Sequence, residues 1–176
     1  MSGSKLTYDM TEEFLELFLS TLDTEDDRAV VRQIVTRFAE CGLPVKTKRY
    51  DTLSMAGTMR IVCHVRKSAE AVIVNNRGMS RDSLSIQVRI DDRDVFEELD
   101  KLGPNVRNQI LNAGNCGFCS PKCDGKRYVF AYDGNEYAKC RTLCSNFFFQ
   151  NIGPDDVSGL MRIINGEIAY KQARNR

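Results

Sequence analysis

Five of the seven cysteines of this chain lie close together, in the order Cys116, Cys119, Cys123, Cys140 and Cys144. Their spacing is C-x2-C-x3-C-x16-C-x3-C. Zinc in structural sites is usually held by four ligands in a tetrahedron, and thiolates are among its commonest ligands. Two short turns that each carry two thiols, joined by a hairpin, have the layout of a zinc ribbon. The spacing therefore predicts a metal site made from four of these five thiols.

The sequence leaves open which four of the five thiols bind the metal ion. Cys116 and Cys119 form the first turn, since two intervening residues let both sulfurs face one ion. Cys140 and Cys144 form a plausible second turn, although its spacing is three residues rather than the usual two. Cys123 is then either the fourth ligand in place of Cys144 or a spare thiol.

Other interpretations of the cluster compete with zinc. Four thiolates also hold an iron–sulfur cluster, although the ligand order of radical S-adenosylmethionine enzymes and of ferredoxins is missing. A redox dithiol at Cys116 and Cys119 would need a helix that begins there, whereas the preceding helix is expected to end there. Buried thiols that act as small hydrophobes do not fit the polar loop 117–125. We therefore expect zinc, with an iron–sulfur protein for electron transfer or redox sensing as the alternative.

No catalytic signature accompanies the cysteines. A zinc ion with four thiolate ligands has no open position for water, which is typical of a structural site. The single histidine, His64, follows Cys63 on a predicted strand, and neighbouring strand residues point to opposite faces. The glycines match no phosphate-binding motif. We expect a non-catalytic protein.

Composition restricts the class of partner. The chain has 176 residues with a formal net charge of +1, which gives no general attraction to nucleic acid. Its N-terminus lacks a secretion signal, and no stretch has the ~20 apolar residues that span a bilayer. We therefore expect a cytoplasmic protein without membrane attachment, because reduced cysteines suit that compartment. Its partner would be a small ligand or a protein. Nucleic acid is possible but less favoured, because the aromatic residues near basic ones in 126–149 are better explained by packing.

The elements that position the cysteines follow from periodicity and end signals. Thr11 and Thr24 are suited to cap two amphipathic helices, Pro104 to open another, and Asp133-Gly134 to form a hairpin turn. Helices are predicted at 12–22, 24–38, 91–102, 104–111 and 154–168. Strands are predicted at 59–66, 71–74, 84–90, 127–132, 135–140 and 144–152.

These elements predict an α+β fold. An N-terminal helical pair is followed by a small antiparallel sheet with flanking helices, then by a Cys-rich, zinc-ribbon-like hairpin and a C-terminal helix. We expect residues 1–115 to form the α+β domain and residues 116–176 to form a metal-binding tail packed on it. The two cysteines outside the cluster, Cys41 and Cys63, are expected in the core.

Overall fold

The computed structural model describes residues 6–49, 58–65, 68–75, 84–116, 125–140 and 146–174. The chain forms two compact units. The first contains Met1–Val88 with Phe148–Pro154, and the second contains Arg89–Phe147 with Asp155–Arg176. Residues 89–115, which the sequence assigns to the first part, thus fall in the same unit as the hairpin. Cys140, the hairpin and most of the last helix also belong to the second unit.

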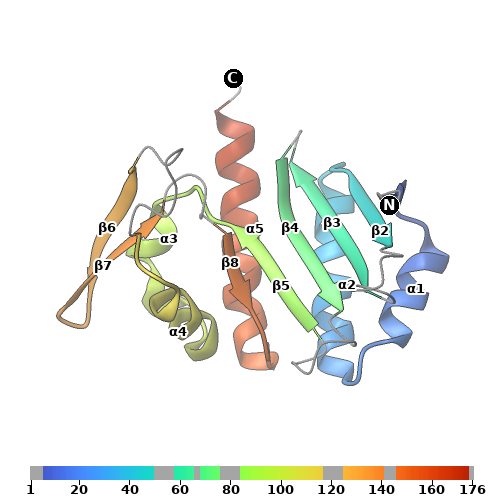
Figure 1. Cartoon of the computed structure of the whole chain (residues 1–176), viewed down its shortest axis with the longest axis horizontal. Helices are drawn as coiled ribbons and strands as arrows, with labels where there is room; N and C mark the ends of the chain where they lie inside the picture. Colours follow the sequence, from blue (N-terminus) through green and yellow to red (C-terminus); the bar gives the residue numbers. More distant parts are fainter. Residues whose placement is uncertain are drawn as a thin grey trace, which may run out of the picture. The chain divides into compact units, whose positions relative to one another are not determined.

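The first unit is a sheet with helices on one face (Figure 1). Its helices are α1 (Glu12–Ser20) and α2 (Glu25–Glu40). The strands are β1 (Leu6–Asp9), β2 (Val45–Arg49), β3 (Met59–Val65), β4 (Ser68–Asn75), β5 (Leu84–Arg89) and β8 (Asn146–Phe149). They are ordered β1-β2-β3-β4-β5-β8, and neighbours from β1 to β5 pair antiparallel. Arg89 and the first two residues of β8 are counted with the second unit.

Both predicted helix caps of this unit are present. The hydroxyl of Thr11 accepts a hydrogen bond from the Phe14 N–H at 3.2 Å, and that of Thr24 accepts one from the Asp27 N–H at 3.0 Å. Each hydroxyl satisfies an N–H that the first helical turn leaves without an internal partner. The two helices begin where the sequence predicts.

The core of this unit lies between the helices and one face of the sheet. Ile61, Ile73 and Ile86 are consecutive partners across β3, β4 and β5, and each is 0% exposed. Cys63 is also fully buried, as predicted, and this burial raises the pKa of its thiol. Cys41 caps the end of α2 but is only half-buried, so the expectation of a core thiol is wrong at this position.

The sheet is larger than the sequence predicts, because β1 and β2 were not expected and β8 joins its edge. In β2 the residues between Val45 and Arg49 alternate Lys-Thr-Lys, with Thr47 on the buried face at 2% exposure. Threonine is a weak hydrophobic signal, so the period of two is hard to recognise. The α+β class is nonetheless confirmed.

The second unit combines short helices, one long helix and a hairpin. Its elements are α3 (Asp94–Glu97), a 3-10 turn (Leu99–Lys101), α4 (Pro104–Asn112), β6 (Arg127–Tyr132), β7 (Asn135–Cys140) and α5 (Pro154–Ala173). The helix predicted at 91–102 is thus divided into α3 and the 3-10 turn. Pro104 opens α4 as predicted.

The starts of α4 and α5 approach each other closely. A Cβ on Gly103 would lie 2.7 Å from the Asp156 Cα, so only glycine fits there. The approach lets Asp156, which is buried, accept a hydrogen bond from the Asn105 N–H at 3.0 Å. A carboxylate of α5 thereby caps α4, whose own N-cap residue is a glycine without a side-chain acceptor.

The last helix, α5, buries Leu160, Ile164 and Ile168, as the predicted apolar stripe requires. It continues through Asn165-Gly166 without a break. In the described ranges of the chain, no helix has both the length and the apolar composition needed to cross a membrane.

Candidate metal centre

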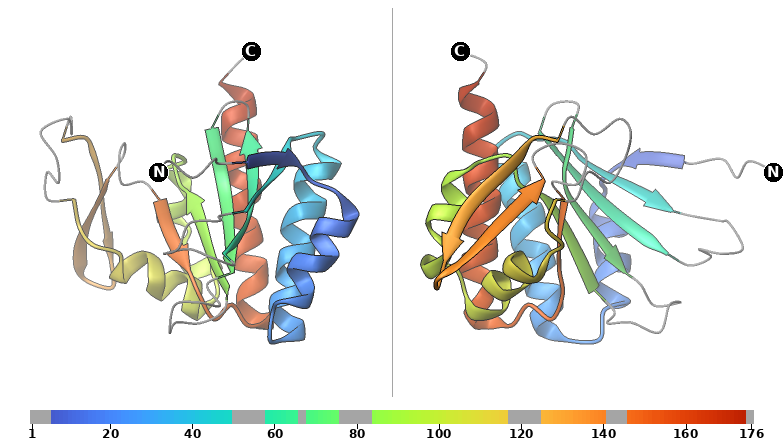
Figure 2. Two further views of the ribbon diagram at one scale, coloured as in Figure 1. Left: turned by 45° about the vertical axis from the view of Figure 1, so that its right-hand side comes forward. Right: turned by 60° about the vertical axis from the view of Figure 1, so that its left-hand side comes forward.

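The hairpin that follows the first three cysteines forms as predicted. Asp133 and Gly134 have φ angles of 48° and 74°, which suit the tight turn of a two-residue hairpin. The register pairs Tyr132 with Asn135 at the turn and Arg127 with Cys140 at the open end. The right-hand view of Figure 2 shows the two strands in orange.

One face of the hairpin is aromatic and packs within the second unit. Phe130 stacks on Phe96 with ring centroids 4.9 Å apart, and Tyr137 stacks on Phe130 at 5.4 Å. The hydroxyl of Tyr128 donates to the carbonyl oxygen of Asp91 at 2.7 Å. These contacts use the aromatic side chains for packing, in agreement with the sequence interpretation.

Lys139, on the same face, attaches the hairpin to the end of α4. Its side chain is 1% exposed, and its ammonium donates to the carbonyl of Leu111 at 2.9 Å and to that of Ala113. A cation near the last carbonyls of a helix complements the helix dipole. Burial lowers the pKa of Lys139 from its ordinary value. Together with Asp156 at the other end, α4 has a complementary charge at each terminus.

Cys140 lies on the opposite face of the hairpin, yet it is buried. Residues of β6 and β7 alternate between the two faces, so Val129, Ala138 and Cys140 share this face. Val129 is 51% exposed, whereas Cys140 is 6% exposed. Burial of a thiol at the open end of an otherwise solvent-facing surface distinguishes Cys140 from its neighbours.

Cys116 lies along the outer edge of β7, the edge that does not pair with β6, and close to Cys140 in register. Its backbone N–H donates to the carbonyl of Ala138 at 2.6 Å, and the Ala138 N–H donates to the side-chain oxygen of Asn115 at 3.3 Å. Ala138 is two residues before Cys140 on the same face. The structure therefore brings the backbones of the first and fourth candidate cysteines to one edge of the hairpin.

The remaining candidates, Cys119, Cys123 and Cys144, lie outside the described residues. Within the described part of the chain, no three His, Cys, Asp or Glu side chains gather as a metal site, and the four cysteines placed there form no disulfide with each other. Of the five candidate cysteines, the structure therefore describes Cys116 and Cys140, and the predicted four-thiolate site stays a prediction.

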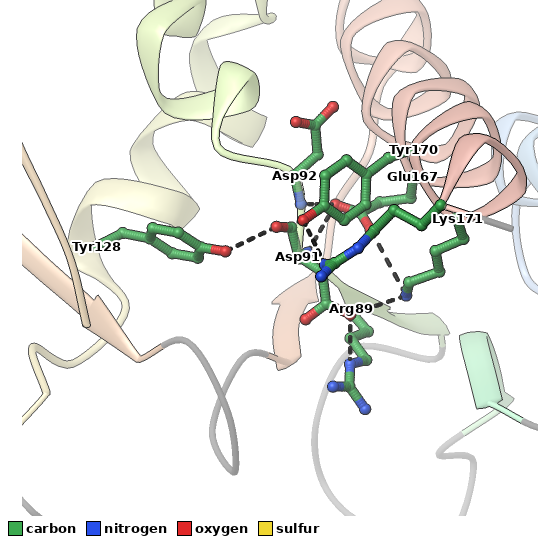
Figure 3. Close-up of polar contacts among 8 residues, drawn as sticks. Arg89, Asp91, Asp92, Tyr128, Glu167, Tyr170 and Lys171 are labelled. Carbon is green, nitrogen blue, oxygen red and sulfur yellow. Dashed lines mark hydrogen bonds and ion pairs between the residues drawn. The ribbon is translucent and has the colours of Figure 1, made fainter. Parts of the chain in front are cut away.

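A buried charged cluster, which the sequence did not predict, positions the segment after β5 (Figure 3). Glu167 of α5 is 0% exposed, and one carboxylate oxygen accepts from the N–H groups of Asp91 and Asp92, each at 2.7 Å. Lys171 and Arg89 approach the Asp91 carboxylate at 3.1 Å and 2.9 Å. The signal was present in the sequence, because Glu167 falls at helical spacing from Ile164 on the apolar stripe. Through Asp91, this cluster also supports Tyr128 and so the hairpin.

A groove of about 730 Å³ runs between α4 and the hairpin. The hydroxyl of Tyr132 donates to the carboxylate of Asp100 at 2.7 Å, and the guanidinium of Arg107 lies over the Tyr132 ring, 5.8 Å from its centre. Tyr137 and Asn108 also line the groove. Its walls are polar and aromatic. No local sequence pattern marks it, because its residues come from separate elements.

Comparisons of the chain with protein-family models, with curated proteins and with solved structures found no match. The function is therefore inferred from the residues and contacts of this chain alone.

Proposed function

We propose that the protein is a ligand-binding module in which a structural metal ion, zinc in the first instance, orders the β6–β7 hairpin. Four thiolates from the set Cys116, Cys119, Cys123, Cys140 and Cys144 would hold the ion. The bound metal would supply cross-links between the loop that precedes β6 and the end of β7. The module would work in a reducing compartment, where the thiols remain available to a metal.

The burial of Cys140 is the observation that carries this proposal. A metal site needs its thiolates shielded from water and close together, and Cys140 is shielded, at 6% exposure. The backbone of Cys116 is hydrogen-bonded to Ala138, two residues before Cys140 on β7, which supports the proposal that their thiols share one ion. A four-thiolate site contributes on the order of 10–16 kcal/mol of apparent binding energy in small domains, which is enough to order a short hairpin.

The groove supports the ligand-binding half of the proposal. Its Tyr137 wall is held by stacking on Phe130, and its α4 wall is held by charges at both helix ends. Walls fixed in this way lose little freedom when a ligand binds, which favours affinity. The mixed polar and aromatic lining fits a small polar molecule with an apolar face.

Metal analysis of protein purified without oxygen or chelators tests the proposal. We expect about one zinc per chain, and loss of the metal in Cys116→Ser and in Cys140→Ser. Cys41→Ser is the matched control and should retain the wild-type metal content. Iron with acid-labile sulfide would select the electron-transfer alternative. Metal-free protein whose five clustered thiols all titrate would reject a metal site of either kind.

The groove requires a separate test. A library of small polar metabolites is screened by NMR against the metal-loaded protein, and shifts are expected for the amides of Tyr132 and Tyr137. Tyr137→Ala should abolish the binding of any hit, while Val129→Ala, on the other hairpin face, should not. Ligands that shift only the NMR signals of residues outside the groove would contradict its role as a binding site.

A further inference from the structure

The outer edge of β6 has hydrogen-bonding groups that β7 does not use. In a two-residue hairpin the pair beside the turn, Tyr132 and Asn135, is hydrogen-bonded, and hydrogen-bonded and non-bonded pairs then alternate. Three pairs are therefore of the non-hydrogen-bonded type: Ala131 with Glu136, Val129 with Ala138, and Arg127 with Cys140. The N–H and C=O of Arg127, Val129 and Ala131 consequently point away from β7.

The contacts of Ala138 verify this alternation independently. Ala138 is the partner of Val129, and its N–H and C=O bond to Asn115 and Cys116 rather than to β6. The outer edge of β7 is thus occupied by residues 115–116. Among the described residues no strand pairs with the outer edge of β6, where Arg127, Val129 and Ala131 are all exposed.

This edge has a single charged residue, Arg127, and otherwise lacks the features that usually prevent strand addition. Proteins protect edge strands with proline, bulges or inward-pointing charges. The strand Arg127–Tyr132 reads Arg-Tyr-Val-Phe-Ala-Tyr and has a regular register with no bulge. Its exposed face has a valine at its centre, and Val129 is one of the few large apolar side chains exposed in the described chain, at 51%. The edge is therefore suited to accept another strand.

We propose that β6 pairs antiparallel with β6 of a second copy of the chain, which makes a four-stranded sheet β7-β6-β6-β7 across a two-fold axis. With the axis at Val129, Val129 of one copy faces Val129 of the other, and Arg127 faces Ala131 of the second copy. The three pairs are all of the hydrogen-bonded type, so every outward N–H and C=O of these residues finds a partner.

The charges of the hairpin are self-complementary in this register. Glu136 is the neighbour of Ala131 across the hairpin, so Arg127 of one copy lies two strands, or ~10 Å, from Glu136 of the second copy. Only the small Ala131 side chain stands between them, and the two long side chains can meet above it. The two-fold axis repeats this ion pair on each side of the central valines. A second copy therefore fits the edge by hydrogen bonds, apolar contact and charge.

Analytical ultracentrifugation of the full chain in reducing buffer, over a wide range of concentration, measures the association. The wild type should dimerise reversibly. Glu136→Arg and Arg127→Glu should each weaken dimerisation about tenfold or more, because each puts like charges at both ion-pair positions. The double variant Arg127→Glu with Glu136→Arg should restore it. Glu136→Gln is the neutral control and should have a smaller effect.

A backbone substitution distinguishes strand pairing from other contacts. Val129→Pro removes an N–H that faces away from β7, so the hairpin ladder stays intact while pairing with a second β6 is blocked. We expect this variant to be monomeric, with unchanged amide protection in β7, whereas Val129→Thr should still dimerise. A wild type that is monomeric at all concentrations, or a dimer that survives Val129→Pro with its hairpin intact, would overturn the proposal. Failure of the double charge swap to restore association would do the same.

Discussion

Strands β1 to β5 of the first unit and the hairpin of the second are both antiparallel, but they bury different kinds of side chain. The sheet places Ile61, Ile73 and Ile86 side by side, each 0% exposed. The most buried side chain of the hairpin is Lys139, at 1% exposure. The sheet is held mainly by apolar burial on its inner face, whereas the hairpin is held at a few polar and aromatic points.

This difference follows from strand number. Two strands have too little inner surface for independent stability, while three or more with an apolar face and a covering layer can be stable. The hairpin therefore needs attachments: Lys139 to the end of α4, Tyr128 to Asp91, and, by our proposal, a metal at the open end.

Metal removal should have the largest effect. Thiolate–metal bonds worth on the order of 10 kcal/mol are lost, so β6 and β7 should lose amide protection and proteolysis should begin between Asn115 and Asn146. The strands β3 to β5 should keep their protection because their apolar core contains no metal ligand. Hydrogen exchange with and without a chelator measures both regions. Degradation of the whole chain at one rate would show that the metal supports a single cooperative unit.

A cavity in the sheet should have the next largest effect. Ile73→Ala removes a fully buried side chain and should lower the free energy of unfolding by about 2–5 kcal/mol. Val129→Ala in the hairpin removes a side chain that is half exposed and should change it by only about 0.5 kcal/mol or less. Urea unfolding of both variants makes the comparison. Equal losses would mean that the two regions do not differ in how they are stabilised.

The polar attachment of the hairpin should contribute less than the sheet core. Lys139→Met leaves the carbonyls of Leu111 and Ala113 without their donor and should cost about 1–3 kcal/mol. Lys139→Arg keeps a donor and a charge and should cost less. The readout is amide exchange in the last turn of α4 and in β7. If the methionine variant is as stable as the wild type, the apolar stem of the side chain, not its ammonium, attaches the hairpin.

The smallest effect should come from an exposed ion pair of the second unit. Hydrogen bonds from Lys101 and Arg162 hold the pKa of Glu98 below its ordinary value. The ionised carboxylate therefore stabilises the folded chain at pH values above the ordinary carboxyl pKa, and this contribution is lost as pH falls through the lower, folded pKa. In Glu98→Gln the acid side of the stability profile should be flatter. Superimposable profiles would show that solvent screening cancels the interaction.

The sequence predicted correctly the features that depend on residues close together in the chain, and it missed features that depend on residues far apart in the chain. Thr11, Thr24, Pro104 and Asp133-Gly134 were correctly assigned, because caps and tight turns depend on residues within three or four positions. The division of the helix predicted at 91–102 and the extra strands β1 and β2 were missed. Strand pairing depends on partners elsewhere in the chain, and a short polar strand such as β2 has little pattern of its own.

The features of the candidate site also divide into those set by local sequence and those set by distant partners. The sequence by itself determined that five cysteines flank a hairpin, a spacing that favours a metal site, and it determined the turn that brings the two strands together. Only the tertiary structure decided that Cys140 is buried on an exposed face, that Cys116 bonds along β7, and that Lys139, Asp156 and Glu167 are buried with partners. A buried charge is stable only where distant backbone groups or opposite charges converge on it, and no local pattern of residues encodes that convergence.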